Sequence, residues 1–224
     1  MTLYVGALVA TKRHAHHATQ IILAPRGVTV NDASGSVRAS MIVIPPRLPH
    51  GHGETDHAAL LFLDGDAPVS RELAHRPIWT RDHGDLTVPC DPTPAQARAL
   101  LVAILDVIDP GRMPAARHPA VRRMCALLDG GHRGDLARLA RDAGLSPRQM
   151  RHAFARDVGL SMRAYIRWQR VRRAIAAVES GANLSAAAVA AGFADSAHLS
   201  RVFREQFGMM PIQGLSSVRW RTLD

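Results

Sequence analysis

A repeat in the C-terminal half limits the possible folds of this chain more than any other feature. The repeat aligns Leu139–Gly159 (LARDAGLSPRQMRHAFARDVG) with Val189–Gly208 (VAAGFADSAHLSRVFREQFG), so that a Gly, an apolar residue, a Phe and a second Gly coincide. The Phe and the second Gly are five residues apart in both copies. Gly permits the positive φ that ends a helix and turns the chain sharply. Each copy therefore predicts a short helix, a tight turn at the first Gly and a second helix.

Helix-start signals locate the second helix of each copy. Ser146 is a favoured N-cap, Pro147 stands at the first helical position, and Gln149 completes a capping box. Asp195 is the matching N-cap in the second copy. This is the pattern of a helix-turn-helix, whose second helix enters the DNA major groove by its N-terminal half. The sequence therefore predicts two recognition helices.

Helical periodicity gives each predicted recognition helix an inner and an outer face. The inner face is apolar and comprises Met150, Ala153, Phe154, Leu199, Val202, Phe203 and Phe207. The outer face carries the candidate DNA-binding residues, which are Arg148, Arg151, His152, Ser196, Ala197, Ser200 and Arg201. Arg reads guanine or holds phosphate, Ser bonds to several bases, and Ala contacts a thymine methyl group. Any one exposed Arg can equally be a phosphate contact or a solvated side chain.

Ser161–Gly181 connects the two copies and has the apolar spacing of one long helix. A rigid helix would hold two recognition helices about 34 Å apart, which is the spacing of successive major grooves on one face of the duplex. A plain bundle of helices is the alternative interpretation of the C-terminal half.

The motifs of this half resemble the DNA-binding domain of the AraC/XylS family of bacterial transcription regulators. The resemblance covers about residues 121–215 and is carried by YIRWQRVRRA and by AAGFADSAHLSRVFREQFGMMP, with its Gly-Phe turn, its Ser-Arg-x-Phe-Arg helix and its closing Gly and Pro. It implies that the seven outer-face residues named above occupy the family's recognition positions. Ala197 is less polar than is usual in the family, and GMMPIQG lacks the frequent Ser-Pro and aromatic residue. Base reading is therefore expected more from the first unit than from the second.

The charge distribution supports a polyanionic partner for the C-terminal half. Residues 1–93 contain 8 Lys+Arg and 9 Asp+Glu, whereas residues 94–224 contain 20 Arg and 10 acidic residues. The excess positive charge therefore lies beyond residue 93, and double-stranded DNA is its expected partner. A proteome that favours Arg explains why Arg outnumbers Lys, but not why the excess lies at one end.

The pattern of apolar residues in the N-terminal part predicts β structure. Short apolar runs at residues 20–23, 40–44 and 58–63 are separated by turn signals at 25–27, 31–35, 45–49 and 64–68. Pro94–Ile108 is predicted to be a capped helix that is apolar on several faces, and Asp109–Pro119 a Pro/Gly linker. The predicted fold class is α+β, with a small N-terminal cupin-like β-barrel followed by an all-α domain. The predicted boundaries are a sensor at 1–91, a helix and linker at 92–118, and a double helix-turn-helix domain at 119–218.

Histidines are the most distinctive feature of the N-terminal part. On a strand, His14, His16 and Gln20 would share one face because side chains alternate. With PPRLPHGHGE these residues resemble the two motifs of cupin barrels, which implies a metal site at His14, His16 and His50. Gln20 and Arg47 stand where that resemblance expects Glu and Gly. Three neutral imidazoles suit zinc, nickel, copper or iron; an organic effector, or regulation without an effector, is the alternative.

The resulting expectation is a sequence-specific transcription regulator, not an enzyme, whose barrel responds to a small ligand or a metal. No catalytic residue is assigned. RNA polymerase is an expected partner if the protein activates transcription, and the helix at 94–108 would serve a homodimer. The sequence has no long apolar run, no signal peptide, and two Cys that stand in no metal-binding or redox spacing. These features predict a cytoplasmic protein without a membrane partner. The alternative is a cupin metalloenzyme, a dioxygenase or isomerase, with a basic helical domain.

Overall fold

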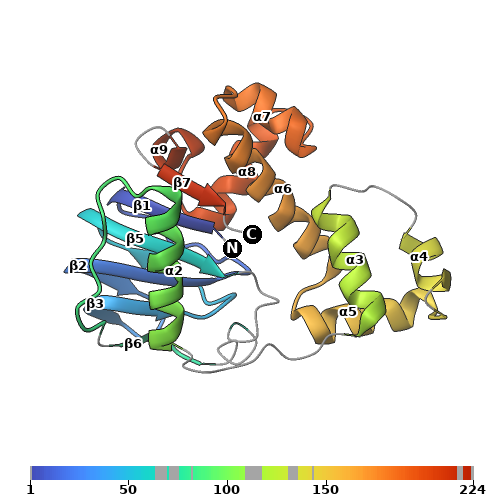
Figure 1. Cartoon of the computed structure of the whole chain (residues 1–224), viewed down its shortest axis with the longest axis horizontal. Helices are drawn as coiled ribbons and strands as arrows, with labels where there is room; N and C mark the ends of the chain where they lie inside the picture. Colours follow the sequence, from blue (N-terminus) through green and yellow to red (C-terminus); the bar gives the residue numbers. More distant parts are fainter. Residues whose placement is uncertain are drawn as a thin grey trace.

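The computed structural model confirms the α+β class, with an antiparallel sheet followed by helices (Figure 1). The structure describes residues 2–63, 70, 76–81, 83–108, 118–130, 136–142, 144–215 and 219–222. Figure 1 shows a sheet at one end of the molecule, helices α3, α4 and α5 at the other end, and helix α6 running between them.

The sheet has seven strands in the order β6-β3-β2-β5-β1-β7, with β4 paired to β2. All the strand pairs are antiparallel. The strands are β1 (Thr2–Leu8), β2 (Thr19–Asn31), β3 (Ser36–Ile44), β4 (Gly51–His52), β5 (Thr55–Leu63), β6 (Trp79–Thr80) and β7 (Arg219–Thr222). Alternation along the strands gives the sheet two apolar faces, which explains why its central strands read as nearly continuous apolar runs.

Two sequence predictions about this region change, and one strand was not predicted. The predicted turn at 25–27 lies inside β2, where the pairing with β3 shifts between Leu23 and Val28, because a bulge absorbs extra residues without ending a strand. The closed barrel is not confirmed, since β6 and β7 lie at opposite edges of the described sheet. β7, from the C-terminal end of the chain, pairs with β1. The predicted turn at 64–68 lies outside the described residues.

Helix α2 (Pro94–Ile108) covers one face of the sheet, with the predicted bounds (Figure 1). Thr93 and Gln96 form the reciprocal hydrogen bonds of a capping box at its start. Its buried residues Ala97, Leu101 and Ile104 pack with one face of the central strands. Val102 remains exposed. Residues 109–117 of the predicted linker lie outside the described residues.

The first helix-turn-helix unit has a core of its own. That core combines side chains from α3, α4, α5 and the start of α6, including Met124, Phe154 and Tyr165. The Phe154 and Tyr165 rings meet edge to face with centroids 5.4 Å apart. The helices are α3 (Pro119–Asp129), α4 (Leu136–Asp142), α5 (Pro147–Val158) and α6 (Met162–Glu179).

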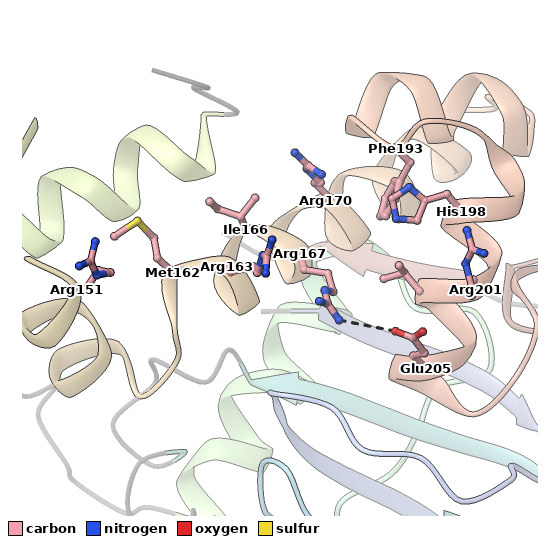
Figure 2. A pocket seen from close by; sticks show the side chains of 11 residues that line it. Arg151, Met162, Arg163, Ile166, Arg167, Arg170, Phe193, His198, Arg201 and Glu205 are labelled. Atoms are coloured by element: carbon pink, nitrogen blue, oxygen red, sulfur yellow. Dashed lines mark ion pairs between the residues drawn. The ribbon is translucent and has the colours of Figure 1, made fainter. Parts of the chain in front are cut away.

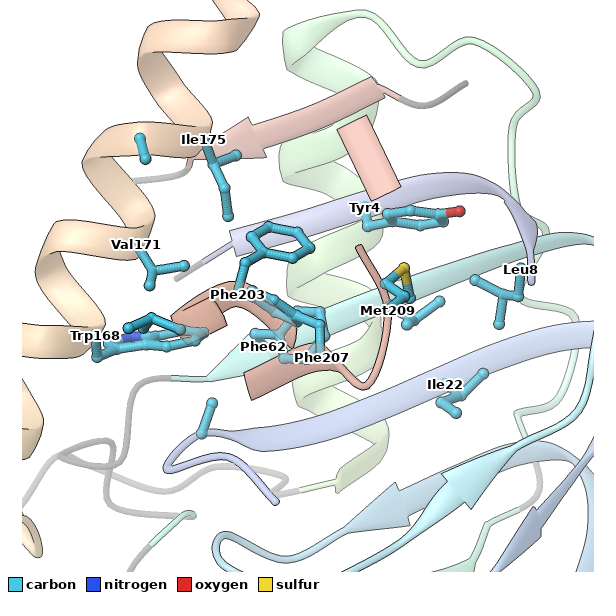
Figure 3. Packing of buried hydrophobic residues seen from close by; sticks show 14 of the residues in the cluster. Tyr4, Leu8, Ile22, Phe62, Trp168, Val171, Ile175, Phe203, Phe207 and Met209 are labelled. Carbon is cyan, nitrogen blue, oxygen red and sulfur yellow. The ribbon is translucent and has the colours of Figure 1, made fainter. Parts of the chain in front are cut away.

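The second unit shares its core with the sheet instead. Phe207 and Met209 pack among Tyr4, Ile22 and Phe62 on the sheet face opposite α2 (Figure 3). Trp168 of α6 closes the cluster, with its ring 6.2 Å from that of Phe62. The helices of this unit are α7 (Leu184–Ala191), α8 (Ser196–Phe207) and α9 (Pro211–Leu215). The N-terminal sheet and the second recognition helix therefore form one hydrophobic core.

Candidate functional sites

Helix α5 is the first recognition helix, and it begins where the sequence predicts. The Ser146 hydroxyl accepts a hydrogen bond from the Gln149 N–H, and the Gln149 side chain accepts one from the Ser146 N–H. Gly144, in the preceding turn, has φ of 68°, the left-handed conformation that Gly tolerates best. Arg148, Arg151 and His152 are exposed, as expected for the outer face of α5.

Helix α8 is the second recognition helix. The Asp195 carboxylate accepts a hydrogen bond from the His198 N–H at 2.6 Å and caps the helix. Among the predicted contact residues, Ala197 and Arg201 are exposed, and Ser196 and Ser200 are half-buried. These positions lie on the N-terminal half of the helix, which is the half that reaches base edges in helix-turn-helix proteins.

A groove of about 850 Å³ runs between the two recognition helices along α6 (Figure 2). Arg151 of α5 lines one end, Arg201 of α8 lines the other, and arginines of α6 lie between them. Arg167 forms an ion pair with Glu205 at 3.7 Å, an exposed contact across α6 and α8. The lining residues are Arg151, Met162, Arg163, Ile166, Arg167, Arg170, Phe193, His198, Arg201, Val202 and Glu205.

The structure thus brings together two of the predicted contact residues and separates others. Arg148 and His152 line a different hollow of about 580 Å³, which also includes His118 and Arg156. Sequence reasoning missed Arg163, Arg167 and Arg170 of the groove. Their spacing of four and then three residues places them on one helical face, and that signal was present in the sequence.

A cluster of three histidines lies in the N-terminal domain, where the sequence predicted a metal site. His14, His16 and His50 are buried, and one ring nitrogen from each lies within 4.8 Å of the others. The Gln20 side-chain oxygen lies 2.9 Å from His16 Nε2 and 3.0 Å from His50 Nε2. The cluster therefore collects three imidazoles and one amide oxygen.

Hydrogen bonds orient all three imidazole rings in the same way. Each Nδ1 lies 2.8 Å from a backbone carbonyl oxygen, of Lys12 for His14, Ala18 for His16 and Leu48 for His50. An Nδ1–H that donates to a carbonyl leaves the lone pair on Nε2, which in His16 and His50 is turned toward the Gln20 side chain; this is the ring orientation of metal-binding histidines. Soft-to-borderline nitrogen donors in this number fit zinc, nickel, copper or iron.

Burial keeps these rings neutral. It lowers the pKa of His16 to about 4 and that of His50 to about 2, with the neighbouring histidines adding repulsion between positive charges. Burial also lowers the pKa of His14. A neutral imidazole is the form that coordinates a metal.

The histidines converge for a different reason from the one predicted. Residues 12–18 are irregular, and β2 begins at Thr19, so strand alternation is the wrong explanation for His14 and His16. Instead His14 and His50 pair through reciprocal backbone hydrogen bonds of 2.9 Å. Arg47, where the cupin pattern has Gly, adopts a φ of 66°. The loop keeps the left-handed conformation that Gly would favour, with a larger residue in it.

Known proteins resemble this chain in two ways, in the helical C-terminal part and in the fold of nearly the whole chain. Residues 139–215 match the model of a helix-turn-helix domain family. Over nearly the whole chain the fold is similar to that of ToxT from Vibrio cholerae. A structure at 1.65 Å resolution has a TM-score of 0.57 and 11% identity over 96% of this chain and 97% of that one. A structure of ToxT bound to an unsaturated fatty acid has a TM-score of 0.57 and 11% identity over 96% and 95%.

A probable AraC family transcriptional regulator from Rhodopseudomonas palustris is 28% identical over 44% of this chain and 96% of that one, with a TM-score of 0.39. The comparison with curated proteins gave no match.

The matched domain and the paired recognition helices define a helix-turn-helix DNA-binding protein. Residues 139–215 therefore form a helix-turn-helix domain, and the fold of nearly the whole chain, with a sheet domain before the helices, is similar to that of ToxT. Among the described residues, none of the helices combines the length and the apolar character needed to cross a membrane.

Proposed function

We propose that the chain is a transcription regulator of the AraC/XylS type, which binds specific DNA sequences by placing α5 and α8 in successive major grooves. The observation that carries the proposal is the groove in which Arg151 and Arg201, from different units, lie on either side of the α6 arginines (Figure 2). On bound DNA, α6 would face the backbone between the two major grooves, where Arg163, Arg167 and Arg170 would hold phosphates.

The N-terminal domain is the proposed effector domain. Two observations support an effector there: the histidine cluster has the donor set of a metal site, and a protein of similar fold has been seen with an unsaturated fatty acid bound. Phe207 and Met209 already fill the sheet face between the domains. The cluster, with its three oriented imidazoles, therefore favours a divalent transition metal over an organic ligand.

The histidine cluster also keeps the second candidate function open, a cupin metalloenzyme. Three imidazoles with an amide in place of a carboxylate could hold a catalytic metal, but among the described residues the cluster contains no carboxylate to act as its acid or base. Two results would decide for the regulator over the enzyme. Replacing Arg151 and Arg201 should abolish DNA binding, and replacing His14, His16 and His50 should change only the regulation of that binding.

Selection from a random duplex library by the full-length protein, followed by footprinting at physiological salt, tests the DNA-binding proposal. We expect two enriched patches about 10 base pairs apart, centre to centre, because each recognition helix reads one major groove. Absence of sequence enrichment, or a single patch, would overturn the two-helix arrangement. Repeating the footprint with a chelator and with added Zn²⁺ then tests the effector: an unchanged footprint would overturn metal control and leave the DNA-binding proposal intact.

A further inference from the structure

The two recognition helices end at equivalent glycines of the repeat. Gly159 ends α5 with φ of 75°, and Gly208 ends α8 with φ of 68°. Each glycine donates its N–H to a carbonyl of the last helical turn, Ala155 for the first and Arg204 for the second, at 2.9 Å. Both glycines are contacted by loops of the N-terminal domain, and the two loops are those that carry the histidine cluster.

The first contact comes from Arg47. Its Nη2 donates a hydrogen bond to the Gly159 carbonyl oxygen at 2.6 Å, across 112 residues of sequence. A guanidinium at this point satisfies a carbonyl that the end of α5 leaves without a helical partner, and its charge suits the negative end of the helix dipole. The backbone N–H of the same Arg47 donates to the His16 carbonyl at 2.7 Å. Arg47 therefore joins one of the clustered histidines to the end of the first recognition helix.

The second contact is steric. A methyl group added to Gly208 would lie 2.6 Å from the Lys12 carbonyl oxygen and closer still to His14 Nδ1, so the Gly208 backbone packs directly on this histidine. The Lys12 carbonyl is also the group that orients the His14 ring. Gly144 has the same φ of 68°, yet a methyl group there would meet nothing within 4 Å. At Gly208 the absence of a side chain thus serves the close approach of His14 as well as the turn.

The two contacts are connected to each other through the loops that carry the histidines. The reciprocal backbone hydrogen bonds of His14 and His50 tie the two histidine loops together at 2.9 Å. A tetrahedral metal with bonds of about 2.0–2.1 Å to nitrogen holds its ligand atoms roughly 3.3 Å apart, and the three ring nitrogens lie within 4.8 Å of one another. Coordination would therefore fix the spacing of the two loops, and with it the positions of Arg47 and His14.

We propose that a first-row transition-metal ion at His14, His16 and His50 controls the relative placement of α5 and α8 through the contacts of Arg47 with Gly159 and of His14 with Gly208. The inference rests on the metal site of the proposed function and adds the route from that site to the DNA. Because coupling is reciprocal, DNA must change the affinity for the metal by the same factor by which the metal changes the affinity for DNA.

The experiment measures two quantities on the full-length protein. Co²⁺ titration, followed by its visible absorption, measures binding at the cluster, with His16→Ala as the ligand-loss variant and His57→Ala as a control outside the cluster. Amide hydrogen exchange with Zn²⁺ or with a chelator then measures protection at the ends of α5 and α8. We expect one Co²⁺ per chain, lost in His16→Ala only, and at least about tenfold slower exchange at both helix ends with Zn²⁺.

Two further variants separate the two contacts. Arg47→Ala should remove the zinc effect at the end of α5 and keep it at α8; Arg38→Ala is its control, because Arg38 also donates to a backbone carbonyl but within the sheet domain, at Arg26. Gly208→Ala should remove the effect at α8; because its methyl group would press on His14, Co²⁺ titration first checks that this variant still binds the metal, and the effect at α5 should then remain. Gly144→Ala introduces the same left-handed strain without the contact, and should keep both effects.

Three results are decisive. The selective losses just described would support the coupling. Co²⁺ binding at the cluster without any change in exchange at either helix end would overturn the coupling and leave the metal site standing. Failure to bind Co²⁺, or equal binding by wild type and His16→Ala, would overturn both the coupling and metal control, while selection and footprinting still decide DNA binding independently.

Discussion

The two helix-turn-helix units share a sequence pattern but differ in what they pack against. α5 buries Phe154 among helices of its own unit, whereas α8 buries Phe207 against Phe62 of the sheet, with ring centroids 5.2 Å apart. The first unit touches the N-terminal domain through Arg47, and the second shares a core with it. One motif can therefore have a core of its own in one copy and share the core of the sheet domain in the other.

The largest expected effect distinguishes the core of the first unit from the core that the second unit shares with the sheet. Replacing Phe154 or Phe207 by Ala should each cost about 3–5 kcal/mol, because each removes a buried ring from a packed core. Phe154→Ala should lower protection from hydrogen exchange in α3–α5 and leave the sheet unchanged. Phe207→Ala should lower it in both α8 and strands β1, β2 and β5. If Phe207→Ala left the strands protected, the shared core would not be a cooperative unit.

The next largest effect concerns the contributions of the two units to DNA binding. Arg151→Ala should weaken binding to the selected site by about 1–3 kcal/mol and relax the preference at one base step, if Arg151 reads a base. Arg201→Ala should weaken binding to all sequences more evenly and reduce the dependence of affinity on salt. Competition assays at several salt concentrations measure both quantities. A uniform loss with a shallower salt dependence for Arg151→Ala would assign it to phosphate instead.

Acid should destabilise the part of the molecule that contains the histidines, measured with a chelator present. Burial lowers the folded-state pKa of His16 to about 4 and of His50 to about 2, so below pH 6.5 the unfolded chain binds protons that the folded chain does not. Stability is therefore lost as the pH falls from about 6.5 toward 4, by about 1 kcal/mol per histidine at pH 5.5. Denaturation of wild type and His16→Gln at several pH values gives the free energy of unfolding as a function of pH. Its slope should be smaller in the variant; equal slopes would contradict this origin.

The smallest effect concerns the N-caps. Ser146→Ala and Asp195→Ala should each cost about 1 kcal/mol, because each leaves an N–H at a helix start without its acceptor. The loss at Ser146 should appear as faster hydrogen exchange in α5 alone. Ser146→Gly is the matched control and should cost only a few tenths of a kcal/mol. If Ser146→Ala also loosened the sheet, the first unit would not be independent of it.

Local sequence signals predicted the helical half closely. The caps at Thr93, Ser146 and Asp195 start helices at the predicted residues, because a cap satisfies backbone groups within three residues of itself. The turn predicted at 25–27 was wrong, since the same residues also suit a bulge and pairing with β3 decides between the two. The convergence of His14, His16 and His50 was predicted, but from the wrong local conformation.

The sequence by itself determined the repeat, its two capped recognition helices, the concentration of positive charge around them and the set of histidines. These features depend on spacing, side-chain type and capping, which act within a few residues. The tertiary structure decided that Phe207 joins the core of the sheet, that β7 pairs with β1, and that Arg47 and His14 reach Gly159 and Gly208. Contacts between residues more than a hundred positions apart depend on how whole faces pack, and no short-range pattern in the chain specifies them.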